Sequence, residues 1–300
     1  MRQKIISDNA CKMQTGNTEH AGEIQAGISG NTGEKHTGVA ESIWERQTGI
    51  SEEEREFIRQ YRADAYERPS VTADIVVFTL DEEDALNILL IQRKGFPYKD
   101  HWAIPGGFLD VNRESIDDTA RRELREETGL ALDSSCLRQL YTFGRPDRDP
   151  RTHVVSVAYT ALIPKAQLKL QAGDDAGDAR LFRIRYDVGG MLFESDGLTI
   201  GETQLAFDYA MIIRTAITRI RGRIDYEPDA FWLLKDRSEF TIYELKRIYE
   251  SIKNTELDTA NFRKSFIRNY VNTGRVIDLQ RKRRETGKKP TELYAYVETL

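Results

Sequence analysis

The sequence has few of the residues that build disulfide frameworks or histidine metal centres. It has two cysteines in 300 residues, Cys11 in a polar segment and Cys136 on its own, and four histidines. Two isolated cysteines provide neither a disulfide framework nor a zinc site. No apolar run approaches the roughly 18 residues of a membrane helix, and the N-terminus has no apolar signal segment. We therefore expect a cytoplasmic protein with no membrane partner.

The first 43 residues contain no aromatic residue and no proline. They are rich in Gly, Thr, Asn and Glu, and they hold too little apolar surface to offset the entropy of ordering the chain. Residues 1–50 are therefore predicted to form a disordered tail. Hydrophobic residues make up 39% of the whole chain, which is enough for packed cores in the remainder. We expect two domains there, 51–200 and 201–300.

No strong charge of one sign marks the chain as a whole, because the net charge is only −5. This average hides an asymmetry along the chain. The last 100 residues hold 19 Lys or Arg against 15 Asp or Glu, whereas the first 200 hold 25 against 34. An acidic first part and a basic second part predict different partners for the two domains.

The hydrophobic patterns predict an α+β protein. Apolar, β-branched runs separated by turn residues predict strands, at 71–80, 87–94, 137–143, 153–163 and 179–184. Capping residues and the spacing of apolar residues predict helices, at 51–62, 115–128 and 205–224, from 241, and from 259 to about 270. Two further β-like runs, 276–280 and 292–297, follow the last helix.

Three acids lie close together on the predicted helix 115–128. Glu123 and Glu127 are one turn apart on the same face, and Glu126 lies to the other side of Glu123. Such carboxylates repel one another, and a hard divalent cation such as Mg²⁺ or Mn²⁺ converts the repulsion into coordination. The tight turn formed by residues 105–107 before the helix can bring a backbone carbonyl near the same ions. The alternative is a solvated helix face whose charges pair along the helix.

The spacing around this helix resembles the signature of the Nudix hydrolase family. Six residues stand at signature positions after Gly107, namely Glu114, Arg122, Glu123, Glu126, Glu127 and Gly129. The one departure is a spacing of six residues, not five, between Gly107 and Glu114. The resemblance implies a Nudix α/β/α sandwich with a mixed sheet, and hydrolysis of a nucleoside diphosphate linked to another group.

The resemblance also implies roles for individual residues. The metal ligands are Gly107, Glu123, Glu126 and Glu127, and the cofactor is Mg²⁺ or Mn²⁺. Catalytic roles fall to Glu114, Arg122, Glu123 and Glu126, and we expect Arg122 to pair with Glu114 and fasten the loop to the helix.

The loop 144–151 carries three arginines between two predicted strands. Guanidinium groups suit a diphosphate better than lysines do, although Asp-Pro turn chemistry explains the prolines equally well. This loop and its surroundings resemble the ADP-ribose pyrophosphatase branch of the Nudix family. We therefore expect ADP-ribose or a related nucleotide sugar as ligand, bound by Arg93, Arg145, Arg148, Arg151, Asp174 and Asp175.

Acids and aromatic residues around these strands have two interpretations each. Asp174, Asp175 and Asp178 are candidates for the general base or an accessory metal site, or they form a polar hairpin turn. Similarly, Phe96, Tyr98 and Trp102 are candidates for stacking on adenine, or they belong to the core.

Two capped helices followed by a hairpin predict a winged helix-turn-helix near the C-terminus. Residues 261–289 hold ten basic residues and two acids. Basic side chains on a recognition helix and wing are typical of duplex binding, and the alternative is a solvated basic surface. The candidate DNA contacts are Arg263, Lys264, Arg268, Arg281, Lys282, Arg283, Arg284, Lys288 and Lys289.

The combination of a Nudix signature with these C-terminal segments resembles the Nudix-related transcriptional regulators of NAD metabolism. The resemblance covers about residues 67–297. It implies a ligand-sensing Nudix domain and a winged helix that binds double-stranded DNA as a homodimer.

Two functions compete on this evidence. The intact carboxylates favour a Mg²⁺-dependent hydrolase of ADP-ribose or a related compound, fused to a DNA-binding winged helix, and we favour this interpretation. The alternative is a transcriptional regulator whose Nudix domain senses ADP-ribose or a sugar effector without significant hydrolysis. A C-terminal part that serves only for dimerisation is a third interpretation.

Overall fold

The computed structural model describes residues 50–128, 137–168, 170, 176–284 and 289–297. The predicted disordered tail lies outside these residues, apart from Ile50. Two compact units are present. The smaller one includes residues 50–69 and Val111–Arg113, and the larger one spans Ser70–Asp110 and Glu114–Leu300.

The smaller unit contains the predicted first helix, α2 (Glu52–Gln60), and a short 3-10 turn, η2 (Ala63–Ala65). Ser51 and Glu54 form a capping box, with Glu54 N donating to Ser51 Oγ at 3.2 Å. The helix buries none of its residues.

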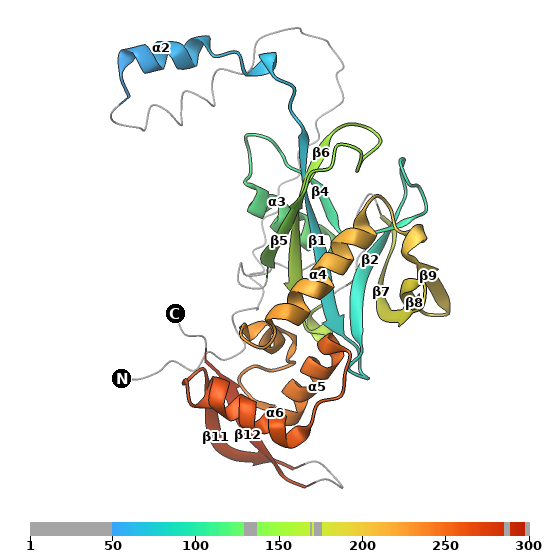
Figure 1. Ribbon diagram of the computed structural model, residues 1–300, viewed down its shortest axis with the longest axis vertical. Helices are drawn as coiled ribbons and strands as arrows, with labels where there is room; N and C mark the ends of the chain where they lie inside the picture. The colour runs from blue at the N-terminus through green and yellow to red at the C-terminus, as the bar shows by residue number, and fades with distance from the viewer. Residues whose placement is uncertain (1–49, 129–136, 169, 171–175, 285–288, 298–300) are drawn as a thin grey trace, which may run out of the picture. The chain divides into compact units, whose positions relative to one another are not determined.

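A mixed sheet of nine strands lies at the centre of the larger unit (Figure 1). Its order is β5-β6-β1-β2-β7-β8-β9, with β3 paired to β2 and β4 paired to β1. The pair β1–β6 is parallel and the other pairs are antiparallel. The strands are β1 (Ser70–Leu80), β2 (Leu86–Arg93), β3 (Trp102–Ala103), β4 (Gly106–Phe108), β5 (Leu137–Phe143), β6 (Val154–Leu162), β7 (Ala176–Asp187), β8 (Gly190–Ser195) and β9 (Leu198–Gly201).

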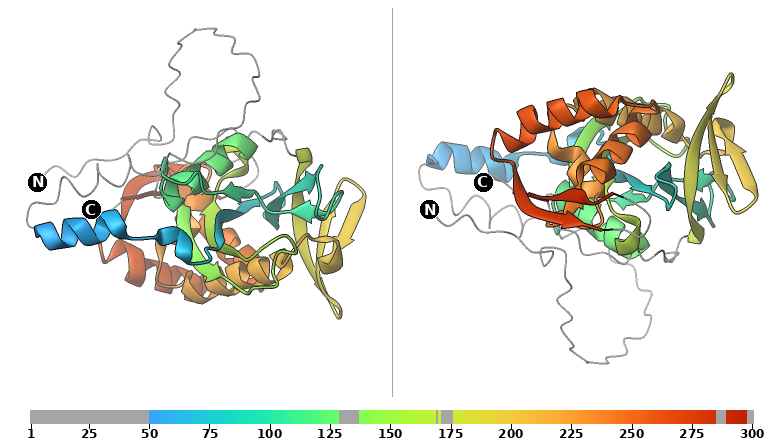
Figure 2. Two further views of the ribbon diagram at one scale, coloured as in Figure 1. Left: turned by 90° about the horizontal axis from the view of Figure 1, so that it is seen from above. Right: turned by 90° about the horizontal axis from the view of Figure 1, so that it is seen from below.

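Helices cover both faces of this sheet, which confirms the predicted α/β/α sandwich. Along β1, Ile75 and Val77 pack with Ala120 and Leu124 of α3 (Ile116–Thr128). The alternate residues, among them Val76, belong to the core that contains the buried face of α4 (Tyr209–Arg223). Figure 2 shows α3 and α4 on opposite sides of the sheet. Alternate residues of β1 point to opposite faces of the sheet and so belong to two different hydrophobic cores.

The C-terminal segment forms the predicted winged helix. It consists of η6 (Pro228–Leu233), β10 (Phe240–Thr241), α5 (Ile242–Lys253), α6 (Thr259–Phe266), β11 (Val276–Arg283) and β12 (Thr291–Tyr296). Thr241 caps α5 in a capping box with Glu244, and Asp258 caps α6. After α6 the backbone continues as a π-helical turn, η7 (Ile267–Val271).

Several elements differ from their predicted bounds. Helix α4 begins at Tyr209, not at residue 205, because Leu205 forms a parallel bridge with Trp102 and Ala206 N donates to Trp102 O at 2.8 Å. The region 187–204 contains the strands β8 and β9. A short 3-10 turn, η4 (Lys165–Gln167), precedes β7, and another, η5 (Glu202–Gln204), follows β9. No helix in the described ranges has the length and apolar character that crossing a membrane requires.

Candidate functional site

Two consecutive glycines make room for two buried carboxylates, Glu123 of helix α3 and Asp74 of β1. In β4, Gly106 and Gly107 pair with Asp74 and Ala73 of β1. A Cβ atom on Gly107 would lie 2.0 Å from Oε1 of Glu123, and one on Gly106 would lie 2.5 Å from Oδ1 of Asp74. The absence of side chains therefore brings Glu123 directly against the turn. Burial raises the pKa of Glu123.

Glu114 and Arg122 fasten the loop to helix α3 as predicted. Arg122 donates from Nε and Nη2 to the two carboxylate oxygens of Glu114, at 3.1 and 2.9 Å. Glu114 also accepts from the backbone of Asp110 and the hydroxyl of Thr119. The guanidinium of Arg122 and the Asp110 amide hold the pKa of Glu114 down at about 2. The extra residue of the loop leaves this contact intact.

The carboxylates of α3 do not form a ready-made metal site. Arg122 Nη1 donates to Glu123 at 2.6 Å and lies 3.4 Å from Glu126. Glu127 is buried and the side chain of Glu126 is half exposed. Among the described residues, no group of three acids, histidines or cysteines lies close enough to hold an ion.

The donor atoms nevertheless fit Mg²⁺ or Mn²⁺. They are all oxygens, which these hard cations prefer, and they include a carboxylate buried against a turn that lacks Cβ atoms. Arg122 supplies the compensating charge beside Glu123 in this arrangement. A divalent cation would take over that role.

The three arginines of loop 144–151 have different environments. The side chain of Arg148 is 4% exposed and donates to both carboxylate oxygens of Asp208, at 2.7 and 3.1 Å. Arg145 is exposed and pairs with Asp147. Arg151 pairs with Asp149 at 2.8 Å and remains partly exposed. Arg148 is thus committed to a buried ion pair, and Arg151 is better placed to meet a ligand.

Two of the predicted ligand-binding arginines, Arg93 and Arg151, contact the same aromatic ring, that of Phe207. The guanidinium carbons of Arg93 and Arg151 lie 5.0 and 5.9 Å from the ring centroid of Phe207, and that of Arg151 lies 5.4 Å from the ring of Phe108. Phe108 directly follows Gly107, and its carbonyl accepts from Arg122 at 3.1 Å. The arginines and the carboxylate helix therefore border one site.

Sequence reasoning missed Phe207, Phe108 and Asp208. Residues 205–208 were assigned to the helix that follows, where a phenylalanine is ordinary core material. Asp208 stands immediately before the observed helix α4, a position that aspartate commonly occupies. That preference is the one sequence signal that marks the true start of the helix.

The other predicted residues of this site have mixed outcomes. Asp174 and Asp175 lie outside the described residues, and Asp178 pairs with Arg180. Trp102 is buried edge-on against Phe182 in the core. Tyr98 packs on Phe207, with ring centroids 4.8 Å apart, whereas Phe96 is 84% exposed.

Three of the candidate DNA contacts are engaged within the winged helix. Arg263 pairs with Glu292 at 2.6 Å, and Arg281 pairs with Glu239 at 2.6 Å. Arg283 donates to Glu244 and to the Glu239 carbonyl, both at 2.9 Å. These pairs hold the hairpin to α5 and α6.

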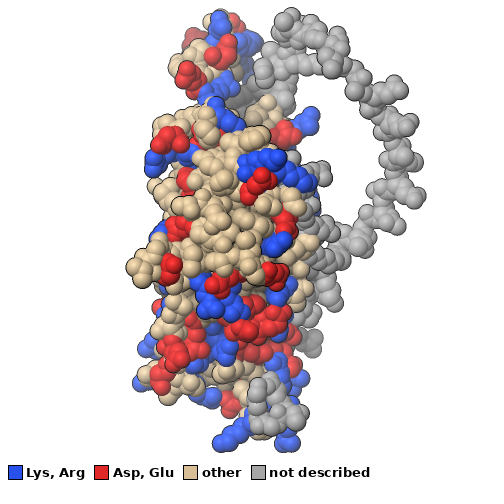
Figure 3. All heavy atoms as spheres, turned by 90° about the vertical axis from the view of Figure 1, so that its right-hand side faces the viewer, with Lys and Arg blue, Asp and Glu red and all other residues tan. Residues whose placement is uncertain are grey.

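The remaining described candidates are exposed, namely Lys264, Arg268, Lys282, Arg284 and Lys289. Lys288 lies outside the described residues. Phe266 of α6 is buried, and Phe262 and Ile267 pack partly buried against the same core. On the face in Figure 3, charges of both signs are mixed over the lower half.

Comparison with known families identifies both parts of the chain. The NUDIX domain family matches residues 69–185, and the family described as NrtR DNA-binding winged helix domain matches residues 230–296. The two matches cover the segments that contain the carboxylate helix and the winged helix.

Three known proteins are similar to different extents of this chain. The ADPR responsive transcriptional repressor NtrR of Acinetobacter baylyi is 32% identical over 247 residues, which cover 81% of this chain and 88% of that protein. An ADP-ribose pyrophosphatase of Methanocaldococcus jannaschii is 36% identical over 157 residues, which cover 52% of this chain and 77% of that protein. The crystal structure of Shewanella oneidensis NrtR with a 27mer DNA superposes with a TM-score of 0.59 at 29% identity, covering 75% of this chain and 93% of that one.

The Nudix match lies over the glycine turn and the Glu114–Arg122 contact, and the NrtR match lies over the two capped helices and the hairpin. The Acinetobacter repressor aligns over 88% of its own length and 81% of this chain. The chain therefore belongs to the Nudix family, in the group whose members carry an NrtR-type DNA-binding winged helix after the Nudix domain.

Proposed function

We propose that this chain is a DNA-binding transcriptional regulator whose Nudix domain binds ADP-ribose or a closely related nucleoside diphosphate derivative. The observation that carries the ligand part is the position of Arg93 and Arg151 around Phe207, beside the turn that holds Glu123. Guanidinium groups at fixed points bind diphosphate oxygens with directed, charge-assisted hydrogen bonds. The repressor from Acinetobacter supports the regulatory part, because its similarity extends through both domains.

The terminal nitrogens of Arg93 are available for such a ligand. Its Nε donates to the Pro97 carbonyl at 3.0 Å, and no carboxylate in the described part of the chain forms an ion pair with it. Arg151 is oriented by Asp149, whose side chain is buried. One arginine is thus held by a backbone carbonyl and the other by a buried acid, so the site is prearranged for an anion.

Exposed cations on the recognition helix and wing support the DNA part. Lys264 and Arg268 extend from α6 and η7, and Lys282 extends from β11. Such residues attract phosphates through a salt-dependent interaction. Helix-turn-helix proteins commonly read two half-sites as symmetric dimers, and we propose the same homodimeric arrangement here.

Hydrolysis of the bound ligand is a second proposed function. The retained Glu114–Arg122 contact and the three carboxylates of α3 favour it, and the pyrophosphatase from Methanocaldococcus is similar over the Nudix segment. A bound Mg²⁺ would supply charge neutralisation at the diphosphate. In this proposal Arg93 and Arg151 orient the diphosphate, and a carboxylate of the glutamate cluster accepts the proton of the attacking water.

Titration calorimetry of the full-length protein with ADP-ribose, without divalent cations so that no turnover consumes the ligand, tests the ligand part. We expect Arg93→Gln and Arg151→Gln each to weaken binding by about 10-fold or more, because a hydrogen bond to a charged group is lost. Arg185→Gln is the matched control, since Arg185 is an exposed, ion-paired arginine of β7. Absence of ADP-ribose binding, or variants that bind as well as the control, would overturn this part.

The DNA part is tested by selecting binding sites from a random duplex library and measuring affinity at several salt concentrations. We expect Lys264→Ala to weaken binding on all selected sites and to reduce the salt slope by about one. Lys165→Ala serves as control, because Lys165 lies in η4 and pairs with Glu82. No enrichment of duplex sequences by the unmodified protein contradicts the regulatory proposal.

Hydrolysis is tested by incubating the protein with ADP-ribose and Mg²⁺ and measuring AMP and ribose 5-phosphate. We expect turnover that Glu127→Gln abolishes and Glu53→Gln, on the exposed helix α2, leaves unchanged. Binding of ADP-ribose without any products would leave the regulator as the sole function.

A further inference from the structure

A continuous series of contacts connects the arginine site with the recognition helix. It begins in loop 144–151, passes through helix α4 and ends at Tyr270 behind α6. Each contact lies within the larger compact unit. A role for this connection in coupling ADP-ribose binding to DNA binding rests on the proposed function.

The first contact fixes the beginning of α4 to the ligand loop. Arg148 holds the carboxylate of Asp208, the residue before the helix, and its Nη2 lies 3.7 Å from Oδ2 of Asp74. Asp74 is buried in β1, and its Oδ1 accepts from the hydroxyl of Tyr209 at 3.2 Å. Buried charges of this kind are costly to separate. A displacement of the loop is therefore carried into the start of α4.

The residue between the ligand arginines and this ion pair is under backbone strain. Phe207 has a φ of 50°, in the left-handed region that bulky residues rarely occupy. Its ring contacts both Arg93 and Arg151 and packs edge-on against Tyr209 at 5.4 Å. Strained residues persist where their surroundings hold them. A diphosphate that draws the two guanidinium groups away changes the contacts that hold Phe207.

The far end of α4 is fixed to the winged helix. Arg221 Nε donates to the Ile252 carbonyl at 2.8 Å, and the carbonyl of Ile224 accepts from the hydroxyl of Tyr249 at 2.8 Å. The Tyr249 oxygen lies 2.6 Å from the hydroxyl of Tyr270. Because the Tyr249 proton is engaged by the carbonyl, Tyr270 donates to Tyr249. Tyr270 belongs to the π-helical turn that extends the recognition helix.

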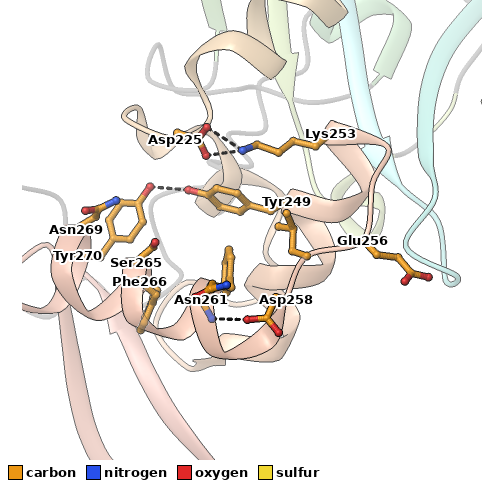
Figure 4. Close-up of a pocket in the computed structure, with 12 residues that line it drawn as sticks. Asp225, Tyr249, Lys253, Glu256, Asp258, Asn261, Ser265, Phe266, Asn269 and Tyr270 are labelled. Atoms are coloured by element: carbon orange, nitrogen blue, oxygen red, sulfur yellow. Dashed lines mark hydrogen bonds and ion pairs between the residues drawn. The ribbon is translucent and has the colours of Figure 1, made fainter.

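There is room for the recognition helix to move at this end. A cavity of about 350 Å³ lies between α5 and α6, and Tyr249, Phe266 and Tyr270 line it. Figure 4 shows the Tyr249–Tyr270 hydrogen bond at its edge, beside the Asp225–Lys253 ion pair. The π-helical turn follows directly, and such turns are irregularities often found at functional positions. A cavity and an irregular turn together permit α6 a second arrangement.

We propose that helix α4 transmits occupancy of the arginine site to recognition helix α6, through the Arg148–Asp208 ion pair at its beginning and the Ile224–Tyr249–Tyr270 hydrogen bonds at its end. Binding of the diphosphate repositions the loop and Phe207, and the change in α4 alters how Tyr249 holds Tyr270. Such coupling needs an element with two arrangements that both ligands bias. The extended recognition helix is that element.

The test measures the affinity of the full-length protein for a selected DNA site with and without saturating ADP-ribose. The ratio of the two dissociation constants is the coupling factor. Tyr270→Phe removes one hydroxyl and leaves the Tyr249–Ile224 hydrogen bond in place, and Asp208→Asn weakens the other end of the connection. We expect each to reduce the coupling factor by about 2- to 30-fold. Tyr243→Phe is the matched control, because Tyr243 is an exposed tyrosine of α5, the helix that also carries Tyr249.

Two further readouts separate transmission from a general loss of structure. Tyr270→Phe should leave the affinity for ADP-ribose, measured by calorimetry, unchanged. The coupling factor of the double variant should be no smaller than that of the single variant with the smaller coupling factor, since both changes interrupt one connection. Folded Tyr270→Phe and Asp208→Asn proteins that keep the unmodified coupling factor would overturn the proposal while leaving the proposed function intact. If one variant fails to fold, the other decides. An unmodified protein whose DNA affinity ignores ADP-ribose overturns the proposed regulation itself.

Discussion

At the scale of single residues, Gly107 has the clearest physical requirement. A Cβ atom there would lie 2.0 Å from Oε1 of Glu123, so alanine must displace the carboxylate or the turn. We expect Gly107→Ala to destabilise the protein by about 1–3 kcal/mol, as overpacking does, and to weaken Mn²⁺ binding measured by electron paramagnetic resonance. Gly95→Ala is the control, because a Cβ there meets nothing within 4 Å. Equal behaviour of the two variants would contradict the close approach.

Glu114 predicts a specific dependence of stability on pH. Its contacts with Arg122 and the Asp110 amide lower its pKa from an ordinary value of 4.5 to about 2. The carboxylate therefore contributes stability that is fully present above about pH 4.5 and is lost progressively as the pH falls towards 2. Glu114→Gln lacks this contribution at every pH. We expect the difference in unfolding free energy between the unmodified protein and the variant to shrink as the pH falls from about 6 to about 3.

Urea unfolding at a series of pH values measures this difference, and Glu53→Gln, in an exposed helix, controls for general acid effects. If the difference in unfolding free energy between the unmodified protein and Glu114→Gln does not change with pH, the contact with Arg122 does not lower the pKa of Glu114.

The sequence predicted the residue types of the candidate site better than their roles. The spacing of Gly107, Glu114 and Arg122 follows local geometry, and their contacts are observed. Arg148 was grouped with its neighbours because all three arginines share one loop. Its burial depends on Asp208, which lies 60 residues further along the chain, and no local pattern reveals such a partner.

At the scale of elements, two capping boxes with the same chemistry have different surroundings. Thr241 is buried at the start of α5, whose inner face belongs to the main core. Ser51 is exposed at the start of α2, which buries no residue. We expect Thr241→Ala to lower the unfolding free energy by about 1 kcal/mol, and Ser51→Ala to change it by less than about 0.5 kcal/mol.

Urea unfolding followed by circular dichroism measures both variants. If Ser51→Ala costs as much as Thr241→Ala, α2 contributes to global stability in spite of its exposed side chains.

Helix starts were predictable where the cap is local and were not where the tertiary structure decides. Ser51, Thr241 and Asp258 each accept from a backbone amide three residues ahead, so a short pattern is sufficient. Helix α4 begins four residues after its predicted start because Leu205 and Ala206 bond to Trp102. An apolar pattern cannot distinguish a residue that packs as the first helical turn from one that pairs with a distant strand.

At the scale of the whole molecule, the Nudix domain and the winged helix share one hydrophobic core. The cluster that contains Phe78 of β1 continues through Ile213 and Ile220 of α4 to Leu245 of α5 and Phe266 of α6. Sequence composition divides the same stretch into two domains, because it registers the change from strands to helices and from acidic to basic residues. Composition carries no information on whether the two parts pack on a common helix, and that packing determines how they unfold.

Shared packing predicts a single cooperative unfolding transition for the two parts. Trp102 reports on the central sheet and Trp232 on the winged helix, and both belong to the common core. In a Trp44→Phe background, Trp232→Phe leaves Trp102 as the probe of the sheet, and Trp102→Phe leaves Trp232 as the probe of the winged helix. In each variant we expect the fluorescence transition and the far-ultraviolet circular dichroism transition to occur at the same urea concentration. Both parts pack on α4, so the unfolding of one exposes the apolar face of α4 on which the other depends. Fluorescence transitions that separate from the circular dichroism transition in either variant would show that the winged helix unfolds alone, and a part that unfolds alone is poorly suited to receive a change through α4.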